Sequence, residues 1–427
     1  MSLRVTVGRT VAGSPYWPVL RHPLLRRVLP GIGLSSLGNG MSTVAISWLA
    51  LELAPAGQRG LWVALAVAAY TLPGAAGALL FGRLLSGRSG AQLAGWDATL
   101  RAGTLAAIPL AHLLGALTVG WYVVLLGVSS LLHAWGTAGR YTMLTELLPQ
   151  RHLLAGNAVV NMMLEFTTVV GPPMAALLIG GSGAVWVIAV DAATFAVLAV
   201  TYRYALPRAS AAQPKSSASR TAGLRVIRRD PRLLGLLALS FGWFFLYGPV
   251  TVALPVYAVE ELGGTPATLA AFYTAFGIGA VVGAFAAGYL RTWPLLPTSI
   301  GIVLCFGVAL VPLGLGVPTT VAWAAFALCG LIWGPFPSTT ITLFQQSTDA
   351  QNLPRVLAAR GAVTVISVPL GAVLGAPALV VLGARGTLLA SAVSIVVVGI
   401  LAAGFFALRR TVTTRRSSAV ATDHTGR

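Results

Sequence analysis

The sequence predicts an all-α membrane protein whose twelve transmembrane helices form two pseudo-symmetric six-helix bundles, with both termini in the cytoplasm. The composition, the apolar runs and the placement of the basic residues lead to this fold. Of the 427 residues, 56% are hydrophobic and only 9% are charged, whereas soluble domains carry about 25% charged residues. An outer-membrane barrel is excluded, because its strands would alternate apolar and polar residues.

The apolar runs are continuous and close to the roughly 20 residues that a helix needs to cross a bilayer. The first run, with Arg26 and Arg27 before it, is too long for the apolar core of a signal peptide and is interpreted as an uncleaved helix. The predicted spans are 28–53, 61–84, 96–118, 119–147, 153–178, 184–206, 233–257, 269–290, 298–316, 319–344, 356–382 and 387–409.

The basic residues fall almost entirely on one side of these spans. Of the 28 Lys and Arg residues, only Arg59 and Arg385 lie in loops on the other side. Because basic loops stay in the cytoplasm, the sequence predicts cytoplasmic termini and an even number of spans. The same scatter between apolar runs argues against a nucleic-acid-binding face, despite a net charge of +18.

The spans divide into two groups of six, separated by a polar stretch rich in serine and alanine that is typical of a flexible linker. Short matches link the two groups: Tyr70-Thr71 with Tyr273-Thr274, and Gly171 with Gly375. Such repeats are typical of transporters. The predicted organisation is a cytoplasmic tail (1–27), an N-terminal bundle (28–206), a cytoplasmic linker (207–232), a C-terminal bundle (233–410) and a second cytoplasmic tail (411–427).

Four stretches carry a resemblance to a known family. They are 35–53 (Ser-Ser-Leu-Gly-Asn-Gly-Met through Trp-Leu-Ala-Leu-Glu-Leu), 97–102 (Asp-Ala-Thr-Leu-Arg-Ala), 148–195 (from Leu-Pro to Asp-Ala-Ala-Thr-Phe) and 223–231. With these stretches the chain resembles a major facilitator superfamily transporter, in the drug:proton antiporter branch with macrolide-efflux and siderophore-exporter proteins. The resemblance implies proton-driven antiport by alternating access, with the first, fourth, seventh and tenth helices facing a central cavity.

Two positions depart from the family pattern. The loop between the second and third helices usually reads Gly-x-x-x-Asp-Arg-x-Gly-Arg-Arg, and here the stretch 82–92 keeps the glycines and Arg88 but lacks the aspartate and the terminal arginine pair. The first helix commonly carries an aspartate where this chain has Asn39. The usual gate charge and the usual proton carrier are therefore both absent.

Ionisable residues inside the spans are the candidates for proton coupling, because charge at membrane depth is costly and usually functional. Glu165 lies about 18 Å along its helix, near the middle of the bilayer, where a carboxyl can exchange a proton for a cationic substrate. The alternative is a permanently protonated glutamate that packs helices together. His133 and Asp191 are further candidates. For Asp191 we favour a helix-packing hydrogen bond, because it lies on an outer helix.

The predicted substrate cavity is aromatic. Its candidate residues are Asn39, Trp48, Asn161, Phe244, Tyr247 and Trp333. Aromatic walls suit a bulky amphipathic ligand, including a cation over a ring face. The five aromatic residues clustered in the seventh helix cannot all face one way, however, and we expect most of them to face lipid or to pack between helices. The predicted cytoplasmic gate is an ionic latch of Arg88, Asp97, Arg101 and Glu146, in which Arg88 pairs with Asp97 or Glu146; solvated loop ends are the alternative.

The sequence therefore predicts a multi-pass exporter of antibiotics or other amphipathic metabolites in a bacterial cytoplasmic membrane, coupled to protons and monomeric. Two alternatives stay open: a proton-independent lipid or lysolipid flippase, and a non-transporting sensor with a transporter fold. An enzyme is not expected, because no His-Glu-x-x-His, phosphate loop or Gly-x-Ser-x-Gly occurs. No cofactor or metal is expected, since Cys305 and Cys329 both lie in apolar runs.

Overall fold

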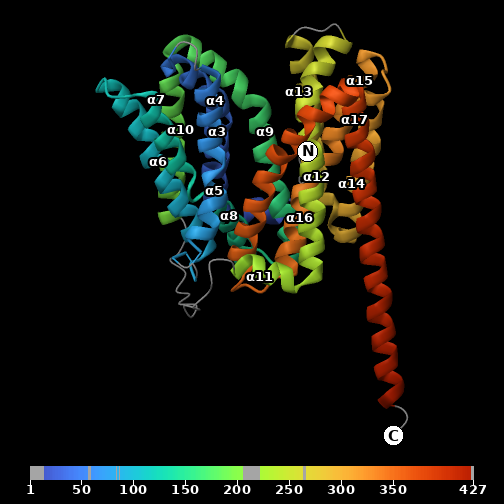
Figure 1. The fold of residues 1–427 in the computed structure, drawn as a ribbon. Helices are drawn as coiled ribbons and strands as arrows, with labels where there is room; N and C mark the ends of the chain where they lie inside the picture. Colours follow the sequence, from blue (N-terminus) through green and yellow to red (C-terminus); the bar gives the residue numbers. More distant parts are fainter. Residues whose placement is uncertain are drawn as a thin grey trace, which may run out of the picture.

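The computed structural model describes residues 14–55, 59–82, 84–85, 87–204, 222–262 and 266–424. Within these ranges every regular element is a helix and no strand occurs. The helices stand side by side as two groups, α3 to α10 and α12 to α17, with the short helix α11 at one end of the molecule (Figure 1). We call this end, the lower one in Figure 1, the α11 end.

The N-terminal group accounts for the first six predicted spans. Two of these spans each consist of two helices, which meet at Pro73 in one span and after Ser130 in the other. Each pair corresponds to one kinked crossing of the membrane. Its helices are α2 (Trp17–Arg21), α3 (Leu25–Leu53), α4 (Arg59–Thr71), α5 (Pro73–Leu80), α6 (Gly90–Leu113), α7 (Val119–Ser130), α8 (His133–Leu147), α9 (Gln150–Ser182) and α10 (Ala184–Tyr204).

The C-terminal group accounts for the other six. Its elements are α11 (Ala222–Arg229), α12 (Pro231–Val256), the π-helical turn η1 (Tyr257–Glu261), α13 (Pro266–Ala287), the 3-10 turn η2 (Gly288–Thr292), α14 (Leu295–Gly314), α15 (Thr319–Trp333), α16 (Pro335–Gln346) and α17 (Leu353–His424). The predicted linker lies outside the described residues up to position 221, and the first predicted tail does so up to position 13.

The last two predicted spans run together as α17, which reverses at Gly383. This glycine has φ 68° and ψ −179°, a backbone conformation that residues with a Cβ rarely adopt. The reversal therefore needs no separate loop, and the second arm of α17 continues well beyond the α11 end of the bundle (Figure 1).

Proline does not break the helices equally. Helix α9 continues through Pro172 and α12 continues through Pro249, whereas α15 ends and α16 begins at Gly334-Pro335. Of these three Gly-Pro pairs, only the last separates two helices.

The two groups share a pattern of close helix contacts. In the first, α3 meets α9 where Gly171 lies against the backbone of Gly40; a Cβ on Gly171 would be 2.6 Å from the Gly40 carbonyl carbon. In the second, α12 meets α17 where Gly248 lies against Gly371, with a corresponding distance of 2.5 Å. Such approaches require glycine and allow helices to pack closely in a membrane. The same helix pair, first against fifth, is thus joined by glycine in each group.

The outer surface of the bundle is apolar. Large aliphatic side chains such as Leu177 (78% exposed) and Val380 (87% exposed) project from it. In the described part of the chain, nine helices are long and apolar enough to cross a membrane. A surface of this kind is unfavourable in water and suits the hydrocarbon of a bilayer.

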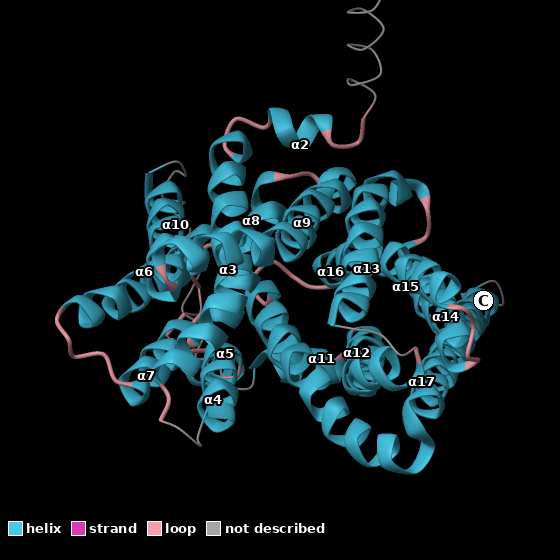
Figure 2. Ribbon diagram, turned by 90° about the horizontal axis from the view of Figure 1, so that it is seen from above, coloured by secondary structure: helices cyan, strands magenta, loops and turns pink. Residues whose placement is uncertain are grey.

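The two groups meet along several helices, mainly α9 with α13 and α16, and α17 with α8 and α5. Seen from above, α3 to α10 occupy one side and α12 to α17 the other (Figure 2). The segment before α2 also joins the groups. The Tyr16 hydroxyl accepts the Gly288 N–H (3.0 Å) and donates to the Phe285 carbonyl, while its ring stacks on Phe285 at 5.4 Å. Burial raises the pKa of Tyr16, which keeps this hydroxyl a donor.

Candidate functional site

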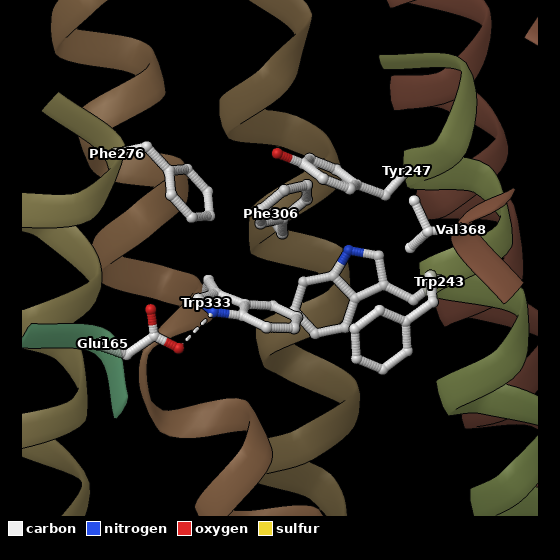
Figure 3. Close-up of a pocket in the computed structure, with 8 residues that line it drawn as sticks. Glu165, Trp243, Tyr247, Phe276, Phe306, Trp333 and Val368 are labelled. Carbon is white, nitrogen blue, oxygen red and sulfur yellow. Dashed lines mark hydrogen bonds between the residues drawn. The ribbon is translucent and has the colours of Figure 1, made fainter. Parts of the chain in front are cut away.

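A cavity of about 230 Å³ lies between the two groups and has almost entirely apolar walls (Figure 3). It is lined by one carboxyl, several aromatic rings and one aliphatic side chain: Glu165, Trp243, Phe244, Tyr247, Phe276, Phe306, Trp333 and Val368. Glu165 comes from α9 in the N-terminal group, and the other residues come from α12, α13, α14, α15 and α17. The cavity therefore spans the boundary across which the two groups would move in alternating access.

Glu165 supplies the carboxyl of this cavity. Its Oε1 accepts a hydrogen bond of 3.2 Å from the indole Nε1 of Trp333 (Figure 3). No ion pair involves Glu165 in the part of the chain that the structure describes. A partly buried carboxyl with one neutral donor keeps free acceptor capacity, so it can bind a proton or a cationic group that enters the cavity.

The aromatic wall is packed edge to face. Trp243 is only 1% exposed, and its ring centroid lies 4.9 Å from Phe306, 5.2 Å from Trp333 and 4.1 Å from Phe336. Phe244 meets Trp333 at 5.3 Å, also edge to face. These geometries are the favourable ones for aromatic pairs. The fixed rings form a wall that can receive a flat apolar ligand or a cation.

A layer of uncharged polar side chains joins the two groups below this cavity, toward the α11 end. We call it the gate layer; its members are Tyr141, Asn157, Asn161, Ser338, Thr342 and Gln345. Asn161 accepts from the Tyr141 hydroxyl at 2.6 Å and donates to Ser338 at 2.8 Å. Asn157 donates to Thr342 and to Gln345, each at 2.7 Å.

The distance of the gate layer from Glu165 follows from the spacing of residues along α9. Asn161 and Asn157 precede Glu165 by one and two turns of α9, about 6 and 12 Å at 1.5 Å per residue. All six side chains are buried. Because buried polar groups are costly when unpaired, these bonds hold the two groups together at the α11 end in this conformation.

A second polar cluster lies wholly inside the N-terminal group. Arg101 is 2% exposed; its Nε is 3.4 Å from Asp97, and its Nη1 donates to the Tyr70 hydroxyl at 3.1 Å. The Tyr70 hydroxyl in turn donates to Asn39 at 2.7 Å. The guanidinium also lies 5.1 Å from the Phe195 ring. This cluster ties α3, α4, α6 and α10 together.

Comparisons with known proteins agree with the fold and identify the family. The family model described as Major Facilitator Superfamily matches residues 28–364. The chain belongs to the major facilitator superfamily. It is a multi-pass protein of the cytoplasmic membrane, and its family and structural neighbours are transporters rather than enzymes.

Related transporters include two efflux proteins. The chain is 27% identical over 401 residues to the multidrug efflux pump Tap of Mycobacterium tuberculosis, covering 88% of this chain and 92% of that protein. It is 25% identical over 272 residues to macrolide efflux protein A of Enterococcus faecalis, covering 60% of this chain and 81% of that protein. The drug-efflux resemblance predicted from sequence motifs is thus confirmed at the level of relatives.

Among solved structures, the chain resembles a bacterial homologue of the iron transporter ferroportin with a TM-score of 0.74 at 15% identity, covering 90% of this chain and 99% of that one. It resembles the transporter FucP with a TM-score of 0.68 at 15% identity, covering 88% and 97%. At these identities the likeness concerns the fold, which is the major facilitator fold predicted from the sequence.

In this fold, four of the predicted coupling and cavity residues come together. Glu165, Phe244, Tyr247 and Trp333 all line the one cavity. Four other lining residues were not among the predicted ones: Trp243, Phe276, Phe306 and Val368. Trp243 is adjacent to the predicted residue Phe244, and Phe276 follows the repeated Tyr273-Thr274 pair by two positions. Nothing in the sequence marked Phe306 or Val368.

The other predicted cavity residues lie elsewhere. Asn161 belongs to the gate layer and Asn39 to the cluster around Arg101. Trp48 is 49% exposed on α3 and is not among the residues that line the cavity. These three positions correct the predicted grouping, because a residue on a cavity-facing helix can point to a neighbouring helix or away from the cavity.

The remaining coupling candidates are buried in the N-terminal group. Asp191 is fully buried and accepts a hydrogen bond of 2.6 Å from Ser42, which is the packing interaction we favoured for it. His133 opens α8 next to Gly74 of α5, and its Nδ1 has no hydrogen-bond partner among the described residues. Neither side chain lines the cavity.

The predicted ionic latch is not formed in this conformation. Arg88 is exposed and lies over the Trp96 ring at 5.1 Å, and no ion pair joins it to Asp97 or Glu146 within the described ranges. Asp97 instead faces Arg101 on its own helix, and Glu146 accepts the Gly90 N–H at 2.9 Å. Each carboxyl has a nearer partner than Arg88, and the uncharged gate layer supplies hydrogen bonds between the groups at this end.

Proposed function

We propose that this transporter exports amphipathic small molecules, antibiotics or other secondary metabolites, in exchange for protons. The observation that carries the proposal is a single carboxyl, Glu165, on the wall of an otherwise aromatic cavity between the two groups. A proton and a cationic substrate would compete for that carboxylate. The names of the efflux relatives support export of drug-like molecules.

The direction of movement follows from the orientation predicted by the basic loops, which places the α11 end in the cytoplasm. With the gate layer closed, Glu165 would be reached from outside and protonated there. When the gate layer parts, the carboxyl would release its proton to the cytoplasm and take up the substrate. Return to the present conformation would carry the substrate outward, driven by the proton gradient.

The cluster of Asp97, Arg101, Tyr70 and Asn39 has a different role in this proposal. It joins four helices of one group through bonds within that group. It would make the N-terminal group move as a rigid body, so that the change occurs at the boundary between the groups.

Proton movement in everted vesicles tests the proposal. The vesicles would be energised, read with a pH-sensitive dye, and given a panel of macrolides, cationic dyes and siderophores. We expect at least one compound to dissipate the gradient with the native protein and to have no effect with Glu165→Gln. If labelled drug or lysolipid crosses the membrane equally with both proteins and without proton movement, the proposal is wrong and the protein acts as a flippase. If nothing crosses, the protein acts as a sensor.

A further inference from the structure

Helix α9 is bonded to α15 and α16 at three successive turns along the boundary between the groups. From the cavity toward the α11 end, the bonds join Trp333 to Glu165 at 3.2 Å, Asn161 to Ser338 at 2.8 Å, and Asn157 to Thr342 and Gln345 at 2.7 Å each. We call this series the α9 seam. Its members on α9 are separated by about 6 Å along the helix, or about one turn. Only the first bond involves an ionisable side chain, so the seam continues the gate layer up to the carboxyl of the cavity.

The indole of Trp333 is held by its own group. Its ring lies edge to face with Trp243 at 5.2 Å and with Phe244 at 5.3 Å, and it stacks on Phe336 at 6.1 Å. All three partners belong to the C-terminal group, whereas the N–H of the same ring donates to Glu165 in the N-terminal group (Figure 3). Because packing fixes the direction of this N–H, a change at Glu165 acts on the C-terminal group through the indole.

Trp333 is also the last residue of α15, at the junction with α16. Pro335 has no N–H to donate to the Leu331 carbonyl one turn earlier, so the helix lacks a backbone bond at the junction and can bend there. Gly334 lies against α13, where a Cβ on it would be 2.3 Å from the Ala284 nitrogen. This close approach supports the bend. The orientation of α16, which carries the gate-layer side chains of the C-terminal group, therefore depends on how the end of α15 is held.

Glu165 is the member of the seam whose charge can change. Tyr141 of α8 and Tyr247 of α12 interact with it electrostatically. Tyr273 of α13 and Cys329 of α15 act on Tyr247 rather than on the carboxyl. Phenols and thiols are uncharged at neutral pH, and no ion pair involves Glu165 within the described ranges. The charge at the cavity end of the seam is thus set by whether Glu165 holds a proton.

We propose that Trp333 is the positioning residue through which the gate layer responds to the charge of Glu165. While Glu165 is a carboxylate, the indole N–H gives it a charge-assisted hydrogen bond, about twice as strong as a neutral one, which holds the end of α15 and keeps α16 aligned with α9. A proton on Glu165 weakens this bond, so that α16 turns at Gly334 and the gate layer parts. The inference rests on the proposed role of Glu165 in antiport and adds how its proton acts on the gate.

This arrangement restrains the empty transporter. An antiporter must not change conformation with its site empty, because such a return would let protons flow without substrate. With neither ligand present, the carboxylate holds the indole and the gate layer stays closed. A proton removes the charge of Glu165 and a cationic substrate neutralises it, so either occupant weakens the bond to Trp333 and allows the conformational change.

The test measures opening of the α11 end as a function of pH, without substrate. The full-length protein in lipid nanodiscs would carry spin labels on cysteines at Gln150 and Asp349, both exposed at this end. Pulsed electron resonance would give the ratio of open to closed molecules from about pH 5 to about pH 9, a range that covers the titration of a buried carboxyl.

The variants separate the donor, the titrating group and the ring. Trp333→Phe and Trp333→Met both remove the indole N–H, and Glu165→Gln removes the titrating group. Trp323→Phe is the matched control on the same helix, because the Trp323 Nε1 has no hydrogen-bond partner among the described residues and the side chain does not line the cavity. The thermal unfolding midpoint of each variant shows whether it is folded.

We expect the ratio of open to closed native molecules to rise about 5- to 10-fold from the high to the low end of the pH range, because the closed state exchanges a charge-assisted bond for a neutral one. Glu165→Gln should keep the low-pH ratio throughout. The two Trp333 variants should be at least as open and should not respond to pH, whereas Trp323→Phe should respond fully.

A rise that persists in both Trp333 variants, its absence from the native protein, or its loss in Trp323→Phe would overturn the inference. Failure of the antiport proposal looks different. If tetraphenylphosphonium releases protons from the native protein and not from Glu165→Gln, while the Trp333 variants respond to pH as the native protein does, only the role of Trp333 is wrong. If Glu165→Gln keeps the pH response and releases protons like the native protein, the antiport proposal is wrong.

Discussion

The gate layer gives the sharpest prediction about conformation. Asn157 makes two hydrogen bonds of 2.7 Å across the boundary, to Thr342 and Gln345. Asn157→Ala removes both and leaves Gln345 buried with fewer partners in the closed state. When the α11 end opens, water can satisfy Gln345. The variant should therefore destabilise the closed conformation more than the open one.

The size of the effect follows from the bonds lost. At about 1 kcal/mol net for each hydrogen bond, the closed state loses about 2 kcal/mol, and the ratio of open to closed molecules rises about 30-fold, at 1.4 kcal/mol per tenfold change. Spin labels on cysteines at Gln150 and Asp349, both exposed at the α11 end, would report this ratio by pulsed electron resonance. Cys305 and Cys329 would be replaced in the background.

Ser240→Ala is the matched control. Ser240 is buried, but its hydroxyl bonds Leu236 within α12 and makes no bond across the boundary. We expect its distance distribution to match that of the unmodified protein. If Asn157→Ala also leaves the distribution unchanged, or shifts it no more than Ser240→Ala, the gate layer does not hold the α11 end closed.

Three further predictions concern the wall, the cluster and the N-terminal contact. Trp333→Ala removes a ring of the cavity and should weaken binding of radiolabelled tetraphenylphosphonium by about 5- to 30-fold, as loss of about 1–2 kcal/mol of cation–π attraction implies. Trp186→Ala on the outer surface should leave the affinity unchanged. Equal affinities of the two variants would show that the ligand does not bind at Trp333. Arg101→Leu leaves Asp97 buried without its cation and should lower the free energy of unfolding by about 3–5 kcal/mol, seen in thermal unfolding of the purified protein, and an unchanged midpoint would argue against the cluster. Tyr16→Phe removes the hydroxyl that bonds Phe285 and Gly288. At about 1 kcal/mol for each of these two hydrogen bonds, the ratio of open to closed molecules in the spin-label assay should rise about 30-fold; no change would show that this contact does not hold the α11 end closed.

The fold could be predicted from the sequence because each membrane-spanning helix is encoded by its own apolar run. Twenty-residue apolar runs predict the number of helices without any knowledge of packing, and the placement of the arginines predicts their orientation. Glu165 and the aromatic residues of the seventh and tenth spans were found in the same way, since a carboxyl at membrane depth is rare enough to be conspicuous.

The partners of these side chains were less accessible, because they depend on helix rotation and on contacts between the groups. Asn39 looked like a substrate-facing position, but helix packing turns it toward Tyr70. The predicted latch consisted of charged residues, because charged residues are easy to recognise in a sequence. In the structure, uncharged side chains such as Asn157, Asn161 and Gln345 join the two groups at the α11 end. Val368 became a lining residue only through the way α17 packs beside α12.

Proton release on substrate binding tests the central claim most directly. Purified protein in lipid nanodiscs and weak buffer would be titrated with tetraphenylphosphonium while a pH-sensitive dye is read. If Glu165 exchanges its proton for a cation, the native protein should release protons in a signal that saturates with the bound ligand, and Glu165→Gln should release none. Binding of the cation without proton release by the native protein, or equal release by both proteins, would contradict coupling through Glu165.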